Sequence, residues 1–279
     1  MTIPYLDADE VARRLSPRAA VDALEAALRG GLAVDADPPR SNVGLDRGQM
    51  LVMPSGLGGH PMVKVVTVGG DPRIQGVCVA FDPVSLAPVA LLDAIAVTNL
   101  RTAAVSALAV RHLAPPDAAR LVVFGRGPQG AAHVAAVEAV RPIASVEVLG
   151  RDAYGRDAAI ARADVICCCT TARRPIFDGA LVADHATVVA IGSHEPDARE
   201  VDDVLVGRAS VVVESVAVAL REAGDLILAD TLRRDELIPL AALVRGEQAP
   251  VPGRPRLFKS VGMAWEDAVV VDALLASAG

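Results

Sequence analysis

The stretch Arg120-Leu121-Val122-Val123-Phe124-Gly125-Arg126-Gly127-Pro128-Gln129-Gly130 decides the fold of this chain. Five residues typical of a buried strand run directly into glycines spaced G-x-G-x-x-G, and the helix-forming run 131–140 follows. In that context, bare glycines let a pyrophosphate approach the unpaired N–H groups of a helix N-terminus. The stretch therefore predicts a dinucleotide-binding strand–turn–helix unit, and the alternative is a tight turn without a ligand.

Patterns of strands and helices continue on both sides of this stretch. Downstream, strand patterns at 145–149, 164–169, 187–191 and 210–213 alternate with helical patterns, which predicts a parallel, doubly wound sheet. Upstream, helical spacing covers 8–30 and 94–113. Between them, short strand patterns separated by Pro and Gly turns predict an antiparallel sheet from 50–53, 62–68, 76–81 and 88–92. The chain is thus expected to be an α/β protein, with the strand at 257–262 and the last helix returning to the first domain.

Composition excludes several kinds of partner. The chain has 279 residues with a formal net charge of −7, and its basic residues form no stripe that would bind a nucleic-acid backbone. Apolar runs end well before the roughly 18 residues that a membrane span needs. The N-terminus has no basic segment followed by an apolar core, so we expect a cytoplasmic protein that binds neither nucleic acid nor membrane.

Cysteine and histidine spacing gives no sign of a metal site. Three of the four cysteines are contiguous, at Cys167 to Cys169, and the fourth is Cys78. We expect the triplet to pack as small apolar side chains in a buried strand, with a redox role as the alternative. The five histidines lack metal-ligand spacing, so no metal is expected.

Two cationic residues fall on apolar faces. Arg101 shares a helical stripe with Val97 and Val105, so it needs an anion, which is either an internal carboxylate or the carboxylate of a substrate. Lys64 alternates onto one face with Met62 and Val66. If it is buried, it can have a lowered pKa and act as an acid or base, and the alternative is an edge-strand lysine that faces water.

Two further positions lie where doubly wound folds bind ligands. His194 follows the strand 187–191 and is a candidate proton donor, although a structural role remains open. After the strand 145–149, the place of the usual ribose-binding carboxylate is taken by Gly150 and then Arg151. Arg can pair with a 2′-phosphate, which favours NADP(H) over NAD(H), unless Arg151 is only a solvated turn residue.

Together these segments resemble the ornithine cyclodeaminase/mu-crystallin family over nearly the whole chain. The matching segments, in order, are Pro38-Pro39-Arg40, Leu51-Val52-Met53-Pro54, Val63-Lys64-Val65-Val66, Leu91-Leu92-Asp93 through Leu100-Arg101-Thr102-Ala103-Ala104, the glycine turn, Ala163-Asp164-Val165-Ile166 to Thr170-Thr171, Ile191-Gly192-Ser193-His194 with Pro196-Asp197 and Arg199-Glu200, and Phe258-Lys259-Ser260-Val261-Gly262.

The resemblance implies two domains and a homodimer. Residues 1–115 with 259–279 are expected to form an α+β domain for substrate binding and dimerisation, and 116–258 a Rossmann domain for NAD(P), with the active site between them. It places Arg40, Lys64, Arg101 and Met53 on segments that bind the substrate and its carboxylate. It places Thr102, Thr170, Thr171, Ser260 and Val261 on segments that line the cofactor, in addition to Gly125, Gly127, Pro128, Gln129 and Gly130 of the turn.

Departures from the family pattern narrow the expected reaction. Leu51 and His194 stand where cyclodeaminases carry acidic residues, and only one short helix fits between Asp152 and Asp164. We therefore expect an NAD(P)H-dependent reductase of a small cyclic ketimine or α-imino acid, with Lys64 or His194 supplying the proton. The alternatives are an ornithine- or lysine-type cyclodeaminase and a non-catalytic, crystallin-like protein that binds a small ligand.

Overall fold

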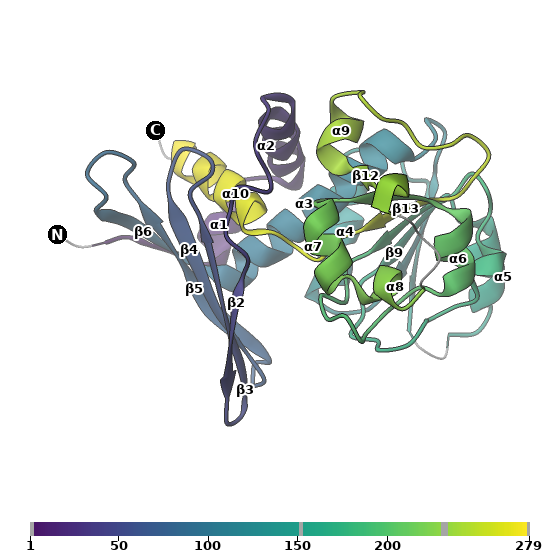
Figure 1. Ribbon diagram of the computed structural model, residues 1–279, viewed down its shortest axis with the longest axis horizontal. Coiled ribbons are helices and arrows are strands. Elements are labelled where there is room, and N and C mark those ends of the chain that lie inside the picture. Colours follow the sequence, from purple (N-terminus) through teal and green to yellow (C-terminus); the bar gives the residue numbers. More distant parts are fainter. Residues whose placement is uncertain (1–2, 151–152, 230–233, 278–279) are drawn as a thin grey trace. The chain divides into compact units, whose positions relative to one another are not determined.

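The computed structural model describes residues 3–150, 153–229 and 234–277, which form two compact units (Figure 1). The first unit is Met1–Thr102 with Met263–Gly279, and the second is Ala103–Gly262. The first junction lies inside helix α3 (Ala94–Leu113), earlier than the predicted limit after residue 115. One reason is that Ser106 of α3 hydrogen-bonds His133 of the second unit, so this part of α3 belongs with that unit.

The first unit is a six-stranded sheet with helices. Its strands and helices are β1 (Tyr5–Leu6), α1 (Ala8–Arg14), α2 (Pro17–Arg29), β2 (Ser41–Leu45), β3 (Gly48–Ser55), β4 (Met62–Val68), β5 (Ile74–Phe81), β6 (Pro88–Asp93) and α10 (Ala264–Ala276). The strand order is β1-β6-β5-β4-β3-β2, antiparallel except where β1 pairs with β6. The predicted antiparallel sheet is confirmed, and β1 and β2 are additions to it. The exposed edge strand β2 lacks the apolar alternation that marks a strand in sequence.

Helix α10 brings the C-terminal segment back to the first unit. It packs against α2 and against strands β3 and β4 (Figure 1). The acidic residues Glu266 and Asp267 lie in its first turn, and both side chains are fully buried. The far end of the chain therefore brings two buried carboxylates into the first unit, and one of them, Asp267, pairs with Lys64 of β4.

The second unit is a seven-stranded parallel sheet with the order β12-β11-β13-β10-β9-β7-β8, which confirms the predicted doubly wound fold. Its elements are β7 (Arg120–Phe124), α4 (Pro128–Glu138), β8 (Ser145–Leu149), α5 (Arg156–Arg162), β9 (Val165–Cys168), η1 (Gly179–Leu181), β10 (Thr187–Ala190), α6 (Asp203–Arg208), β11 (Ser210–Val213), α7 (Val216–Glu222), α8 (Gly224–Ile227), η2 (Arg234–Glu236), β12 (Ile238–Pro239), α9 (Leu240–Val244) and β13 (Arg256–Lys259).

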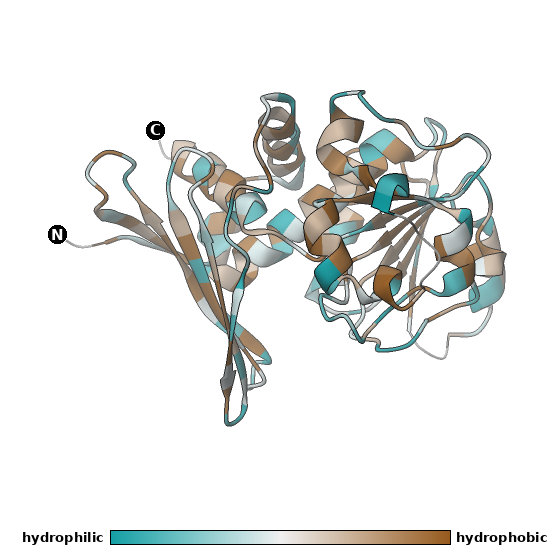
Figure 2. Ribbon diagram, in the orientation of Figure 1, coloured by the Kyte–Doolittle hydropathy of each residue, from teal (hydrophilic) through white to brown (hydrophobic). Residues whose placement is uncertain are grey.

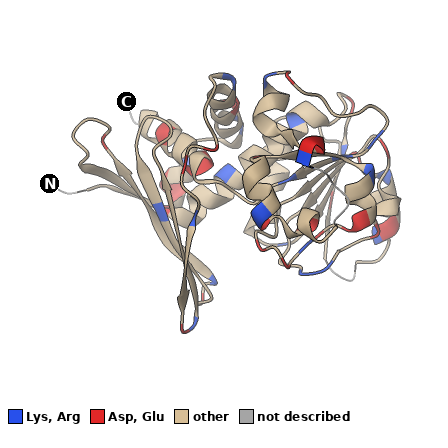
Figure 3. Ribbon diagram, in the orientation of Figure 1, with Lys and Arg blue, Asp and Glu red and all other residues tan. Residues whose placement is uncertain are grey.

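The strands of this sheet are apolar and largely uncharged, whereas charged residues lie mostly on its helices and loops (Figures 2 and 3). Cys167 and Cys168 of β9 are fully buried, and burial raises the pKa of the Cys167 thiol to about 12, so the packing interpretation of the triplet is confirmed for these two residues. The expected return of the last strand to the first domain is wrong, because β13 pairs with β10 and β11 in this sheet. Among the described residues, no helix has the length and apolarity that a bilayer crossing requires.

Candidate functional site

The carboxyl ends of four strands of the second sheet lie level with one another. In the strand register Phe124 pairs with Cys168, Cys168 with Ala190, and Ala190 with Lys259. The segments that follow these strands therefore begin in one row along the same edge. Doubly wound folds bind ligands outside this edge, so it is the candidate cofactor site.

The glycine turn between β7 and α4 meets the requirements of a pyrophosphate cradle. Gly125 has a φ of +118°, and a Cβ on Gly130 would overlap the carbonyl oxygen of Gly125. A Cβ on Gly127, by contrast, would meet no atom within 4 Å, so the turn is open at that point. Gly127 is also the N-cap of α4 and supplies no side-chain cap to its N–H groups. Tight turn, close packing and an open approach are the three roles of glycine in a dinucleotide-binding turn, so the residues present fit this half of NAD(P).

The position after β8, where a ribose carboxylate is usually found, is occupied by Gly150. The guanidinium of Arg126, from the glycine turn, lies beside it, with Cζ 3.6 Å from where a Cβ on Gly150 would stand. Arg151 falls outside the described residues. The single short helix α5 then leads into β9, as predicted from the spacing.

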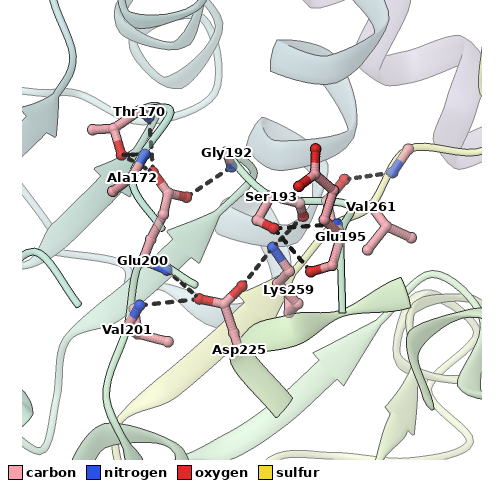
Figure 4. A network of polar contacts seen from close by, with 12 residues as sticks. Thr170, Ala172, Gly192, Ser193, Glu195, Glu200, Val201, Asp225, Lys259 and Val261 are labelled. Carbon is pink, nitrogen blue, oxygen red and sulfur yellow. Dashed lines mark hydrogen bonds and ion pairs between the residues drawn. The ribbon is translucent and has the colours of Figure 1, made fainter. Parts of the chain in front are cut away.

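A buried carboxylate, Glu200, ties two of the edge segments together (Figure 4). Its Oε1 accepts hydrogen bonds from the backbone N and the hydroxyl of Thr170, at 2.8 and 2.6 Å, and its Oε2 accepts one from Gly192 N at 2.7 Å. Burial raises the pKa of Glu200, while the nearby Lys259 ammonium and these hydrogen bonds oppose the rise. The segments that follow β9 and β10 are thus linked through hydrogen bonds to the same side chain, that of Glu200.

A second buried group, the ion pair of Lys259 and Asp225, lies next to Glu200 (Figure 4). The pair is 2.8 Å apart, and both side chains are fully buried. Asp225 Oδ1 accepts hydrogen bonds from the backbone N of Glu200 and Val201, while Lys259 Nζ donates to the carbonyl oxygen of Ser193 at 2.7 Å. The end of β13 therefore holds the residue that precedes His194.

A third buried carboxylate, Glu214, organises the segment after β13. It accepts hydrogen bonds from the hydroxyl of Ser260 at 2.5 Å, from Val261 N at 3.0 Å and from Gly262 N at 3.3 Å. The hydroxyls of Ser260 and Thr170 are accordingly engaged within the protein. If these two residues line a cofactor, the positions of their side chains there are set by the hydrogen bonds to Glu214 and Glu200.

Lys64 lies at the centre of the first unit, inside its sheet. Strand β4 has neighbours on both sides, Met53 and Cys78 stand opposite Lys64, and the lysine side chain is 2% exposed. The edge-strand alternative is therefore wrong. Its Nζ lies 2.7 Å from Asp267 Oδ2 and 3.3 Å from the hydroxyl of Thr98. Burial lowers the pKa of Lys64, and the Asp267 carboxylate opposes this.

Arg101 completes this cluster from α3. Its Nη1 donates to Glu266 at 2.7 Å and its Nε to Asp267 at 3.2 Å, with the arginine side chain 7% exposed. Of the two anions expected for Arg101, the structure shows the internal carboxylates. Two cations and two carboxylates meet in this cluster, and the planar guanidinium has five N–H donors, so internal pairing and binding of a substrate carboxylate are compatible.

The predicted site residues fall into two groups. In the second unit, the glycine turn, Thr170, Thr171, His194, Ser260 and Val261 all belong to segments at the carboxyl edge. In the first unit, Lys64 and Arg101 contact Asp267, and Met53 of β3 stands opposite Lys64 of β4. Arg40 immediately precedes β2, whose Ser41 pairs with Val52. The hydroxyl oxygen of Thr102 is buried without a partner among the described residues.

Sequence patterns did not indicate the role of five buried carboxylates that hold these residues: Glu200, which lies in a matching segment of the family, and Glu214, Asp225, Glu266 and Asp267. Two signals were present. Glu214 directly follows a strand, at a carboxyl-end position, and Glu266 with Asp267 open a C-terminal helix that is mostly apolar. An acidic pair in an apolar helix needs buried cations, and Lys64 and Arg101 were the candidates.

This fold and turn define an α/β protein with a Rossmann-type unit. The chain belongs to the ornithine cyclodeaminase/mu-crystallin family, whose model matches residues 5–161 and 153–277.

Known relatives support the same assignment. The chain is 34% identical over 220 residues to a Δ1-pyrroline-2-carboxylate reductase from Colwellia psychrerythraea, covering 67% of this chain and 68% of the relative. It is 32% identical over 206 residues to the ketimine reductase mu-crystallin of Macropus fuliginosus, covering 68% and 65%. The structure of Thermococcus litoralis Δ1-pyrroline-2-carboxylate reductase in complex with NADH and L-proline superimposes with a TM-score of 0.90 and 25% identity, covering 99% of this chain and 97% of that one.

Proposed function

We propose that the chain is an NAD(P)H-dependent reductase of small cyclic ketimines or α-imino acids, such as Δ1-pyrroline-2-carboxylate. The observation that carries the proposal is the β7–α4 turn, where Gly127 leaves the N-terminus of α4 open to a pyrophosphate. The substrate class is supported by two relatives, a Δ1-pyrroline-2-carboxylate reductase and a ketimine reductase mu-crystallin.

The cluster around Asp267 would hold the substrate in the first unit. Lys64 and Arg101 are the buried cations of this cluster, and we assign them, together with Arg40, to binding of the substrate carboxylate. Met53 lies opposite Lys64, and we assign it to the apolar side of the substrate site. A carboxylate held by two fixed cations restricts the orientation of the adjacent C=N bond.

NAD(P)H, held at the glycine turn between β7 and α4, would supply the hydride for reduction of the imine carbon. The chain must then provide a proton to the imine nitrogen, and Lys64 Nζ is our first candidate because burial lowers its pKa toward the range in which it can release a proton. The ring of His194 is the second candidate, since it follows β10 at the carboxyl edge.

We further propose a preference for NADP(H) and assembly as a homodimer. Gly150 leaves no carboxylate at the end of β8 to repel a 2′-phosphate, and Arg126 lies beside it with Arg151 next in sequence. An open apolar groove between α2 and α10, lined by Ala23, Ala27, Val269, Ala273 and Ala276, supports pairing of two copies of the first unit.

The test is a side-by-side titration of cofactor-stripped protein with NADPH and NADH, followed by nicotinamide fluorescence. We expect both to bind and NADPH to bind more tightly, and the Arg151→Ala variant to lose that preference. Reduction of Δ1-pyrroline-2-carboxylate by the loaded enzyme would then be measured. Failure of folded protein to bind either cofactor would refute the reductase and favour a ligand-binding protein, whereas release of ammonia from ornithine or lysine without net oxidation of the cofactor would favour a cyclodeaminase.

A further inference from the structure

The backbone of the segment that carries His194 is held by two buried charged side chains, Glu200 and Lys259. Gly192 N donates to Glu200 Oε2 at 2.7 Å, and Ser193 O accepts from Lys259 Nζ at 2.7 Å, so two consecutive residues are each fixed by a charged side chain (Figure 4). A side chain at Gly192 would overlap Thr170 O and the Glu200 carboxylate, which shows how closely the two segments approach. His194 is the next residue along the chain.

Lys259 is itself held by a carboxylate that contacts the backbone of Glu200. Asp225 Oδ2 lies 2.8 Å from Lys259 Nζ, and Asp225 Oδ1 accepts from Glu200 N at 2.6 Å. All three side chains are fully buried. Burying charged groups is costly unless each is paired and hydrogen-bonded, and an apolar set of the same volume is often at least as stable. A contribution to stability therefore does not by itself explain why Lys259, Asp225 and Glu200 are buried next to the edge of the sheet where ligands bind.

From this geometry we infer that Lys259, fixed by Asp225, is a positioning residue that sets the Gly192–Ser193 backbone and thereby presents His194 at the carboxyl edge of the sheet. The inference rests on the proposed reductase function. It identifies the side chain that holds the segment of His194, the second proton-donor candidate. A misplacement of about 1 Å is enough to reduce turnover on the order of 100-fold, so a single hydrogen bond to Ser193 O can matter for rate.

The test variant is the double change Lys259→Met with Asp225→Asn. It removes both charges of the pair together, and the Asn oxygen can still accept from Glu200 N and Val201 N. Glu200 loses the nearby ammonium but keeps its hydrogen bonds from Thr170 and Gly192. The matched control is Asp164→Asn, which loosens a carboxylate network at the amino ends of the same strands, where Asp164 accepts from Ala119 N, Arg120 and His185.

Two readouts separate positioning from general stability. Hydrogen exchange of the cofactor-free protein should be faster in a peptide covering 190–196 of the double variant and not in that peptide of the control. With NADPH and Δ1-pyrroline-2-carboxylate, kcat should fall about 10- to 100-fold while KM for the imine changes little. In a His194→Asn background the same double change should cost much less, because the residue that it positions is already gone.

An unaltered exchange rate at 190–196, a kcat within about two-fold of wild type, or full additivity with His194→Asn would each overturn the inference. Wild-type protein that fails to bind NAD(P)H would instead refute the reductase proposal. The exchange experiment on cofactor-free protein then still decides whether Lys259 fixes the segment.

Discussion

Lys64 Nζ lies 2.7 Å from Asp267 Oδ2, in a pair whose side chains are 2% and 0% exposed. The same carboxylate contacts Arg101 through its other oxygen, at 3.2 Å. The C-terminal helix therefore supplies an anion that pairs with both Lys64 and Arg101 inside the first unit. Burial lowers the pKa of Lys64 and the Asp267 carboxylate opposes that effect, while Arg101 also pairs with Glu266 at 2.7 Å.

We expect Asp267→Asn to destabilise the protein by about 3 kcal/mol, because it removes the carboxylate that pairs with the buried cations Lys64 and Arg101. Equilibrium unfolding in urea measures the loss. The matched control is Asp22→Asn, which removes one carboxylate of the exposed Arg18–Asp22 pair on α2 and should cost less than about 1 kcal/mol. Equal losses for the two variants would show that the cluster does not depend on Asp267.

Lys64→Met should reduce kcat/KM for the imine by about 100-fold or more, because it removes a carboxylate-binding cation and the first proton-donor candidate together. Cofactor affinity should stay nearly intact, since the glycine turn that we assign to the pyrophosphate belongs to the second unit. Steady-state kinetics and a fluorescence titration with NADPH measure the two quantities. Parallel loss of turnover and of cofactor affinity would contradict the assigned role.

Much of the fold could be predicted because the signals were local. The glycine spacing after β7 reports backbone requirements that only those residues meet, and the bounds of helix α3 match the predicted 94–113. The place of β13 could not be predicted locally, since a strand's neighbours in a sheet depend on long-range pairing. The two-residue strand β1 carries too few residues for any period to show.

The sequence predicted the cationic residues of the candidate site, but it did not predict the carboxylates that pair with them. Lys64 and Arg101 stood out because a charge on an apolar stripe conflicts with its neighbours. Glu200 and Asp225 lie in segments without regular periodicity or near a helix start, where an acidic residue is commonplace at a protein surface. Only the tertiary structure shows that both are fully buried and that Asp225 pairs with Lys259.

The glycine turn offers a test that separates cofactor binding from folding. Gly127→Val should weaken NAD(P)H binding by about 10-fold or more, because a side chain would occupy the open approach to the α4 N-terminus. Its φ of −85° suits any residue, so the melting temperature should change little. Gly130→Val is the contrasting variant, since its Cβ would overlap Gly125 O and the fold itself should be destabilised. Tight NAD(P)H binding by Gly127→Val would remove the turn from the cofactor site.

The buried His133 should make stability depend on pH. Its Nδ1 lies 2.7 Å from the carbonyl oxygen of Gln129 and must donate to it, so Nε2 of the neutral ring accepts from the Ser106 hydroxyl at 2.9 Å. Burial lowers the pKa of His133 to about 4 from its usual 6.5. The unfolded chain therefore binds a proton first as the pH falls, and stability should decline between about pH 6.5 and pH 4.

The decline attributable to His133 should approach about 3 kcal/mol at the acid end of this window. Urea unfolding of wild type and of His133→Asn at pH 7, 5.5 and 4.5 isolates it, because other titrating groups are common to both proteins. Asn lacks the titrating ring, so the stability difference in favour of wild type should shrink as the pH falls. A difference that stays constant across the series would show that the ring keeps its ordinary pKa in the folded protein.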